Sequence, residues 1–589
     1  MTAELPLICT AAALALVALS LSLGRRPAAV RIFAIVLALL ATAAPLVLAT
    51  LIEPSRAAGR ALWEWSAAGG PTIQASYQFD GIAAIGVAVG AAYTGAGLFG
   101  VARTARRHPL LPSAVLALGL VFSALAVTED LIAGTVILGA LASITILAAL
   151  AVAPLPATTR LAAYLAVGVQ FFVLSALLIS RFGGASFRFD AIVASAVSPG
   201  AILAASVGAA LFAGLYPFIP WRFAAQLRDP ELERLRGVIT MPAGVGAALL
   251  LLRLLGTTRG DLGAILLPDI AVGWRLGVAI LIVAVGAAAW RDRRPPVRGV
   301  VAGGVLLGLL LAYPALHWSH LMIVAALLSV LYAAAVSLAV PEQWEVVRYD
   351  VTLAAFWIAL AVGTPTAVAA GLFILVADAV AALAEAVWTQ RYGSYTVIIA
   401  GAAATVSGLI VIALGSLEAM DSGAQGLAIA AVLAIAALVL IHVGQRLDLA
   451  EVPLALDGLA AAAAAGGTAL VGLLVAVPVY QGVTTAFGRP FAPSVAAAAL
   501  AFPAIVAVAT VLVVVARSLR PFVPDLAPLA ERLHVGAAIA DPVPAGYAAF
   551  AVLDAAMSRT TALFNLFERR AGVWIAMLMI VGILVWSVR

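Results

Sequence analysis

Long apolar runs separated by short polar stretches extend along almost the whole chain. Eighteen such runs are present, the first at 4–22 and the last at 571–588. A helix needs about 20 apolar residues to cross the hydrocarbon core of a bilayer. No stretch shows the alternation over about 10 residues that is typical of a transmembrane β-strand. The pattern therefore predicts an all-α polytopic membrane protein.

Two polar stretches differ from short connecting loops. Residues 53–80 are predicted to form an outside loop, in which Trp63, Trp65 and Tyr77 lie at the lipid headgroups. Residues 221–236 are charged and amphipathic, and we expect them at the inner surface of the membrane.

The stretch before the last apolar run is predicted to be an amphipathic helix that lies along the membrane. Leu553, Met557, Phe564 and Phe567 share one helical face there. We therefore expect three parts, which are a transmembrane domain of about 16–17 segments at 1–516, an inner-surface segment at 517–570 and a final transmembrane helix at 571–589.

Glycine and proline interrupt two of the apolar runs, near 212–220 and near 363–366. Paired broken helices are typical of transporters that are built from inverted repeats. Two ordinary proline kinks explain the same pattern, because prolines are common in membrane helices. The spacing alone favours neither interpretation.

Arginine supplies all 33 of the lysine-plus-arginine residues, and lysine is absent. If the N-terminus is outside, the inner loops carry 24 of the 33 arginines, as the positive-inside rule requires. A single interrupted span at 349–388 would move the basic C-terminal region outside, so we expect two crossings there. The arginine- and alanine-rich composition favours a bacterial source, and the expected location is the bacterial inner membrane.

Composition narrows the possible chemistry. Hydrophobic residues make up 65% of the chain and charged residues 10%, which is typical of a membrane protein. The single cysteine, Cys9, excludes a disulfide within the chain and a cysteine-based zinc site. The five histidines are scattered, and no glycine-rich phosphate loop is present. We expect no metal, no cofactor, no nucleic-acid partner and no active site of the chain's own.

Six short motifs stand out between residues 75 and 375. They are YQFDG at 77–81, PFIPW at 217–221, ITMPAGVGAALLLLR at 239–253, RDRR at 291–294, HLMIVAALL at 320–328 and GTPT at 363–366.

In order and spacing these motifs resemble those of the antiporter-like membrane subunits of complex I, the Mrp antiporters and the membrane-bound hydrogenases. The predicted surface helix before a final span resembles the tail of the largest such subunit. The resemblance implies an antiporter-like bundle with inverted repeats. It also implies translocation of protons or sodium ions, coupled to redox chemistry in other membrane and soluble subunits of a larger complex.

The chain departs from this family at the residues that carry protons. The family's glutamate and lysines, and one of its histidines, fall at apolar positions here, which are Gly139, Phe212, Ile219, Val324 and Phe373. The family's central lysine falls near Arg294, and an arginine cannot relay protons because it stays charged. The losses favour a scaffold or a sealed subunit over an ion-conducting one.

A few titratable residues remain as candidates for a rebuilt ion path. His320 matches a family position, while His317, three residues earlier, is also explained as an interfacial residue beside Trp318. Arg294 is also explained as an anchor at the inner end of a span.

Asp378 and Glu385 lie seven residues apart in an apolar run, so they share a helix face. Carboxylates within a span are costly, and such residues are either functional or paired. Pairing with Arg391 or with a neighbouring chain is the alternative. Asp80, Glu129 and Asp130 stand where spans begin, and a role in solvation or helix capping accounts for them.

Three hypotheses of function remain open. The first is an antiporter-like subunit of a complex I-related assembly, which either conducts ions by a rebuilt path or serves as a scaffold. The second is the membrane partner of a soluble enzyme in an ion-gradient-driven system for inorganic-carbon uptake. The third is an unrelated secondary transporter with broken helices, which the ordered motifs disfavour.

Overall fold

The computed structural model describes a large part of the chain, and every structural statement below concerns that part. The described residues belong to one compact unit within residues 1–538. The predicted inner-surface segment and final transmembrane helix, with the boundary at 516, lie outside them. The described residues are 4–22, 28–51, 61–66, 71–104, 110–152, 155–182, 186–192, 196–215, 230–257, 318–339, 344–387, 391–419, 422–449, 466–467, 471, 476 and 478–484.

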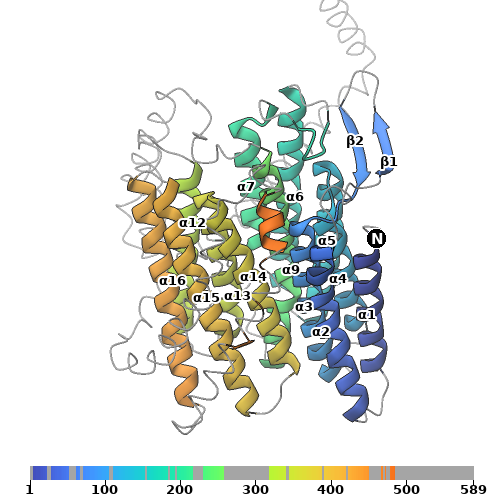
Figure 1. Ribbon diagram of the computed structural model, residues 1–589, viewed down its shortest axis with the longest axis vertical. Helices are drawn as coiled ribbons and strands as arrows, with labels where there is room; N and C mark the ends of the chain where they lie inside the picture. The colour runs from blue at the N-terminus through green and yellow to red at the C-terminus, as the bar shows by residue number, and fades with distance from the viewer. Residues whose placement is uncertain are drawn as a thin grey trace, which may run out of the picture. The chain divides into compact units, whose positions relative to one another are not determined.

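Helices that run alongside one another make up the described structure (Figure 1). Within the described residues, nine helices are long and apolar enough to cross a membrane, so this is a multi-pass membrane protein. The helices of the N-terminal half are α1 (Leu5–Ser22), α2 (Ala28–Leu51), α3 (Gly81–Thr104), α4 (Leu111–Val127), α5 (Leu131–Val152), α6 (Leu155–Arg181), α7 (Pro199–Ala213) and α9 (Pro230–Gly256).

The helices of the C-terminal half contain the candidate site. They are α12 (Trp318–Ala339), α13 (Trp344–Val362), α14 (Pro365–Val387), α15 (Arg391–Ala419) and α16 (Ser422–Leu449). Helix α3 packs against α14, and α9 packs against α13, so the two halves meet along these four helices.

Helices α3 and α9 form the interior of the N-terminal half. Small residues on α3 allow close approach of its neighbours, since a Cβ at Gly90 would lie 2.4 Å from the ring of Phe122 on α4. In contrast, α1, α2 and α6 leave large apolar side chains exposed, among them Leu19, Phe33 and Leu177. These outer helices therefore present apolar faces that suit lipid or a neighbouring membrane subunit.

A buried ion pair joins two of the sequence motifs. The Arg253 guanidinium donates to both carboxylate oxygens of Asp80, at 3.1 and 3.0 Å, and to the carbonyl oxygen of Ala126 at 3.1 Å. Asp80 also accepts a hydrogen bond from the backbone N–H of Ala83, which caps the start of α3. The predicted capping role of Asp80 is confirmed, and its pairing with Arg253 fixes the end of α9 against the start of α3.

This ion pair yields a prediction about stability. Asp80→Asn leaves the buried Arg253 without a counter-charge, and we expect it to lower the free energy of unfolding by about 3–5 kcal/mol. Asp80→Asn combined with Arg253→Met removes both charges and is expected to recover part of that loss. Asp190→Asn, at an exposed carboxylate, is the control and should cost about 1 kcal/mol or less. Unfolding in mixed micelles measures all three; equal losses in the single and the double variant would contradict the account.

A two-stranded antiparallel sheet adds to the predicted all-helical architecture. Strands β1 (Ala61–Ser66) and β2 (Thr72–Ser76) pair within the stretch that was predicted to be a loop. Trp63 and Trp65, which the sequence places at the headgroups, lie on β1 with 56% and 49% of their surface exposed. The sequence signal was missed because a single short hairpin is weak beside long apolar helices.

Both predicted interruptions are helix ends at glycines with positive φ. Gly214 ends α7 at φ 65° and Gly363 ends α13 at φ 67°, a conformation that favours glycine. Thr364 then caps α14 through its hydroxyl, which accepts from the N–H of Ala367, and Pro365 takes the first helical position. The predicted interruptions are therefore confirmed as ends of helices, and neither lies within a continuous kinked helix.

Helices α13 and α14 form an antiparallel hairpin. Arg348 and Glu385 are 37 residues apart in sequence, which is roughly 55 Å along a single continuous helix. Their side chains instead lie 2.5 Å apart. The chain therefore reverses at Gly363–Thr364, as the prediction of two crossings at 349–388 requires. Residues 230–236 of the predicted inner-surface stretch form the first turns of α9.

A short helical segment at 478–484 packs closely against the beginning of α3. A Cβ added at Gly81 would lie 2.0 Å from the carbonyl oxygen of Pro478 and 2.3 Å from the backbone nitrogen of Gly482. Backbone atoms cannot move aside as a flexible side chain can, so this contact requires glycine.

We expect Gly81→Ala to separate this segment from α3 and to lower the free energy of unfolding by about 1–3 kcal/mol. Gly426 on α16 has no heavy atom within 4 Å of the corresponding Cβ position. Gly426→Ala is therefore the matched control, and it should stabilise the helix by up to about 1 kcal/mol. Thermal unfolding of both variants in detergent tests the prediction, which fails if the two midpoints shift in the same direction.

Candidate functional site

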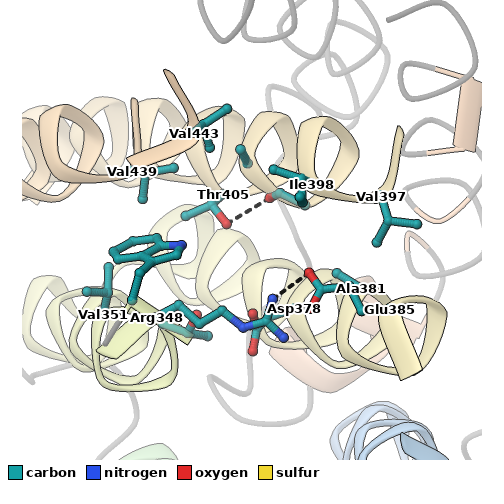
Figure 2. A pocket seen from close by; sticks show the side chains of 14 residues that line it. Arg348, Val351, Asp378, Ala381, Glu385, Val397, Ile398, Thr405, Val439 and Val443 are labelled. Atoms are coloured by element: carbon teal, nitrogen blue, oxygen red, sulfur yellow. Dashed lines mark hydrogen bonds and ion pairs between the residues drawn. The ribbon is translucent and has the colours of Figure 1, made fainter. Parts of the chain in front are cut away.

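An arginine and two carboxylates meet between α13 and α14. The Arg348 guanidinium donates to Glu385 Oε1 at 2.5 Å, and the two side chains are 12% and 21% exposed. Figure 2 shows the Arg348 side chain extending from α13 toward Glu385 and Asp378, with the ion pair to Glu385 dashed. This is the pairing that the sequence left open between Arg391, a neighbouring chain and a functional role.

Asp378 is held from two helices besides its own. The Tyr93 hydroxyl on α3 donates to Asp378 Oδ2 at 2.6 Å, and the Thr352 hydroxyl on α13 also hydrogen-bonds this carboxylate. The bond from Tyr93 links residues 285 positions apart and joins the N-terminal half to the C-terminal half. Asp378 itself is buried.

Tyr349 completes the surroundings of Arg348. The Arg348 guanidinium donates to the Tyr349 hydroxyl at 2.9 Å, and its central carbon lies 4.8 Å from the Tyr349 ring centre. The rings of Tyr349 and Tyr93 meet edge to face at 6.2 Å. We call Tyr93, Arg348, Tyr349, Asp378 and Glu385 the charge cluster.

The helix spacing explains why these residues meet. Arg348 and Thr352 are one turn apart on α13, and Asp378 and Glu385 are two turns apart on α14, so each pair lies on one helix face. Arg348 precedes Gly363 by 15 residues, and Asp378 follows Thr364 by 14. Residues at equal distances from the turn of a helical hairpin lie side by side.

A cavity lies beside the charge cluster. It offers about 50 Å³ of room for water, which is enough for a few molecules, because one water needs roughly 10–15 Å³ measured in this way. Arg348, Thr352, Asp378, Glu385 and Thr405 supply its polar side chains. Trp344, Val351, Ala381, Val397, Ile398, Gly401, Ala402, Val439 and Val443 complete the lining.

The members of the charge cluster differ in what they can do chemically. A carboxylate can accept a proton, whereas a guanidinium stays protonated in proteins. Arg348 therefore supplies a fixed positive charge beside two carboxylates that can gain and release protons through the cavity water. Ionisable groups within membrane spans are costly, and by default they indicate a function or a pairing.

Arg348 was assigned to an inside loop by the sequence analysis, and this assignment was wrong. It lies within the first turns of α13. An arginine at the polar edge of an apolar run satisfies the positive-inside pattern equally well. The hairpin register around Gly363 was the signal that could have placed it opposite Asp378.

The other predicted path residues do not all come together. His320 is buried near the beginning of α12, and it does not line the cavity of the charge cluster. His317 and Arg294 lie outside the described residues. Of the predicted path, the structure brings Asp378 and Glu385 together.

The positions at which the family's relay residues are replaced are apolar in the structure too. Phe212 is fully buried near the end of α7 and contacts Gly168 on α6, and Phe373 is buried against Ala377 and Ala404.

The remaining positions do not lie in a polar cluster. Gly139 is half-buried on α5, with Val169 at 4.0 Å from its Cβ position, and Val324 is half-buried on α12. Ile219 lies outside the described residues.

A second polar cluster lies at the ends of the spans. Arg188 pairs with Glu129 at 3.0 Å and with Asp190 at 2.7 Å, and these carboxylates hold the pKa of Arg188 above its usual range although burial opposes this. The Asp130 carboxylate accepts from the N–H groups of Ile132 and Ala133 and caps α5, while burial raises its pKa. Capping by Asp130 is confirmed. Solvation of Glu129 is wrong, because it is buried and ion-paired.

His442 is a buried titratable residue that the sequence analysis did not single out. It lies on α16 with 1% of its surface exposed, and its ring stacks on Trp344 of α13 at 4.3 Å with an angle of 18°. Its Nε2 lies 2.7 Å from the hydroxyl of Ser337 on α12. A lone histidine inside the apolar run 424–444 was the available signal.

The charge cluster yields a prediction about coupling. Arg348→Met leaves Asp378 and Glu385 without a cation, and we expect the free energy of unfolding to fall by about 3–5 kcal/mol. In the double variant Arg348→Met with Glu385→Met the loss should be smaller by at least about 1 kcal/mol, because one uncompensated carboxylate is removed. A double-mutant cycle in mixed micelles measures the coupling, and additive losses would show that the pair is not energetically linked.

Two solved membrane complexes contain chains of this fold. A chain of the Mrp complex from Dietzia sp. DQ12-45-1b is 15% identical at a TM-score of 0.54, and the match covers 100% of the present chain and 63% of that chain. A chain of respiratory complex I from Thermus thermophilus with bound NADH is 16% identical at a TM-score of 0.51, over 87% of the present chain and 100% of that chain.

These likenesses confirm the predicted fold, which is the bundle of the antiporter-like membrane subunits. The present chain spans 63% of the length of the Mrp-complex chain. No family model and no curated protein matches the sequence.

Proposed function

We propose that this chain is an antiporter-like membrane subunit of a larger complex, and that it transfers protons through the charge cluster of its C-terminal half. The observation that carries the proposal is the meeting of Arg348, Asp378 and Glu385 beside a cavity with room for water. The fold supports a role within a complex, because both solved chains of this fold come from complexes.

The physical basis is a pair of carboxylates next to a charge that cannot leave. Two ionised carboxylates close together in a poorly solvated site repel each other. Arg348 offsets this repulsion for one negative charge, so the second carboxyl gains or loses a proton at a smaller cost. Water in the cavity connects the site to the next proton donor or acceptor.

The proposal departs from the path that the family resemblance implies. Gly139 and Phe212 in the N-terminal half, and Val324 and Phe373 in the C-terminal half, cannot titrate. The charge cluster therefore replaces a relay that runs through those positions. Sodium is the alternative ion, since carboxylates also bind sodium.

A scaffold without ion transport is the second candidate function. The apolar residues at the relay positions favour it, because they leave the N-terminal half without the family's titrating groups. In that case the charge cluster is an ion pair that holds α3, α13 and α14 together. Partnership with an inorganic-carbon enzyme would require the proton path, and a substrate transporter would require a larger polar cavity.

Flux measurements separate these candidates. We expect Asp378→Asn and Glu385→Gln each to lower gradient-driven proton flux about 10-fold or more, because each removes a group that exchanges protons. The protein is reconstituted into liposomes together with its co-purifying partners, and internal pH-sensitive and sodium-sensitive dyes report the two ions.

Glu64→Gln, at an exposed position on β1, is the matched control and should leave the flux unchanged. Wild-type flux no greater than that of protein-free liposomes would reject the proposal and leave the scaffold. Sodium flux that both variants abolish would replace the proton by sodium.

A further inference from the structure

His442 lies next to the cavity wall on a helix that the charge cluster does not use. Val439 and Val443 of α16 line the cavity, and His442 stands between them in sequence. Its ring stacks on Trp344, which lines the same cavity one helical turn before Arg348. The indole thus lies between the imidazole and the water-accessible space.

The hydrogen bond to Ser337 fixes where His442 holds its proton. The Ser337 hydroxyl donates to the carbonyl oxygen of Ala333 at 2.6 Å. A serine hydroxyl has one proton, so its oxygen accepts from His442 Nε2 at 2.7 Å. The neutral imidazole therefore holds its proton on Nε2, and a second proton is gained or lost at Nδ1.

The charged groups around α16 define the setting of such a proton. Within the described side chains, α15 contributes no titratable group over residues 397–417. Arg348 shares the face of α13 that carries Trp344, and Asp378 and Glu385 of α14 lie across the cavity. The titratable or charged residues on α12 and α13, the other helices packed against α16, are His320, Tyr332, Arg348, Tyr349 and Asp350.

We propose that His442 exchanges protons with the cavity water and thereby extends the path from the charge cluster to α12 and α16. This inference rests on the proposed function. A proton that leaves the acid form of Glu385 or Asp378 passes through cavity water to Nδ1, which leaves a carboxylate and an imidazolium. Histidine suits this step because its proton exchange occurs near neutral pH.

Trp344 has two roles in this step. Its flat face stabilises the imidazolium that stacks on it, because a cation is attracted to the face of an indole. It also separates the imidazole from the cavity, so movement of the Trp344 side chain controls when the proton passes. A histidine that only held the helices together would need the hydrogen bond and the stacking, but it would not need to titrate.

Two variants separate proton exchange from a positioning role. His442→Gln keeps an N–H that can donate to Ser337 but cannot titrate, and His442→Phe keeps an aromatic ring against Trp344 but loses the donor. The inference predicts that both lower proton flux about 10-fold or more in liposomes that hold the protein with its partners. Full flux in His442→Gln would overturn it and make His442 a positioning residue.

A second measurement does not depend on flux. Nitrogen-15 magnetic resonance of histidine-labelled protein in bilayers contains signals from five histidines, and the His442→Gln spectrum identifies that of His442. We expect this signal to titrate between about pH 5 and pH 8. A signal that stays neutral over the whole range would overturn the inference. If wild type carries no flux while His442 titrates, the proposed function fails and proton access to His442 stands.

Discussion

The charge on Arg348 constrains the interior of the C-terminal helices. A guanidinium keeps its proton in any protein environment, and a lasting charge among apolar helices needs counter-charges close by. Glu385 supplies an ion pair at 2.5 Å, and Asp378 lies beside it on the next helix face. The α13–α14 hairpin brings these groups together, so the turn at Gly363 is as much a part of the site as the charged residues are.

The same constraint connects the halves of the molecule. Asp378 accepts a hydrogen bond from Tyr93, which lies on the buried central helix α3. The charge cluster is therefore tied to the core of the N-terminal half, where the Asp80–Arg253 pair holds α3 against α9. A change in the protonation of Asp378 alters a bond between the halves, and this gives the cluster a physical means of coupling proton transfer to helix movement.

The fold could be predicted from the sequence to a large extent. Long apolar runs gave the spans, the order of the motifs gave the antiporter-like bundle, and Asp80 was recognised as a helix cap. The hairpin of β1 and β2 was missed because its short strands carry little signal.

The site was predicted in part. Asp378 and Glu385 were singled out because carboxylates in a span are costly. Their partner Arg348 was not, since an arginine at the end of a span looks like a topology signal. His442 was passed over because one histidine in an apolar run has no visible partner, and Ser337 and Trp344 reach it only through the packing of α12 and α13 on α16.

Infrared difference spectroscopy of the protein in bilayers tests most directly whether the carboxyls beside Arg348 exchange protons with water. The account predicts that stepping the pH produces a reversible band of protonated carboxyl groups, and that Asp378→Asn or Glu385→Gln removes or shifts this band. A carboxyl spectrum that does not change with pH, or that is identical in wild type and both variants, would contradict the account and leave the cluster as a structural ion pair.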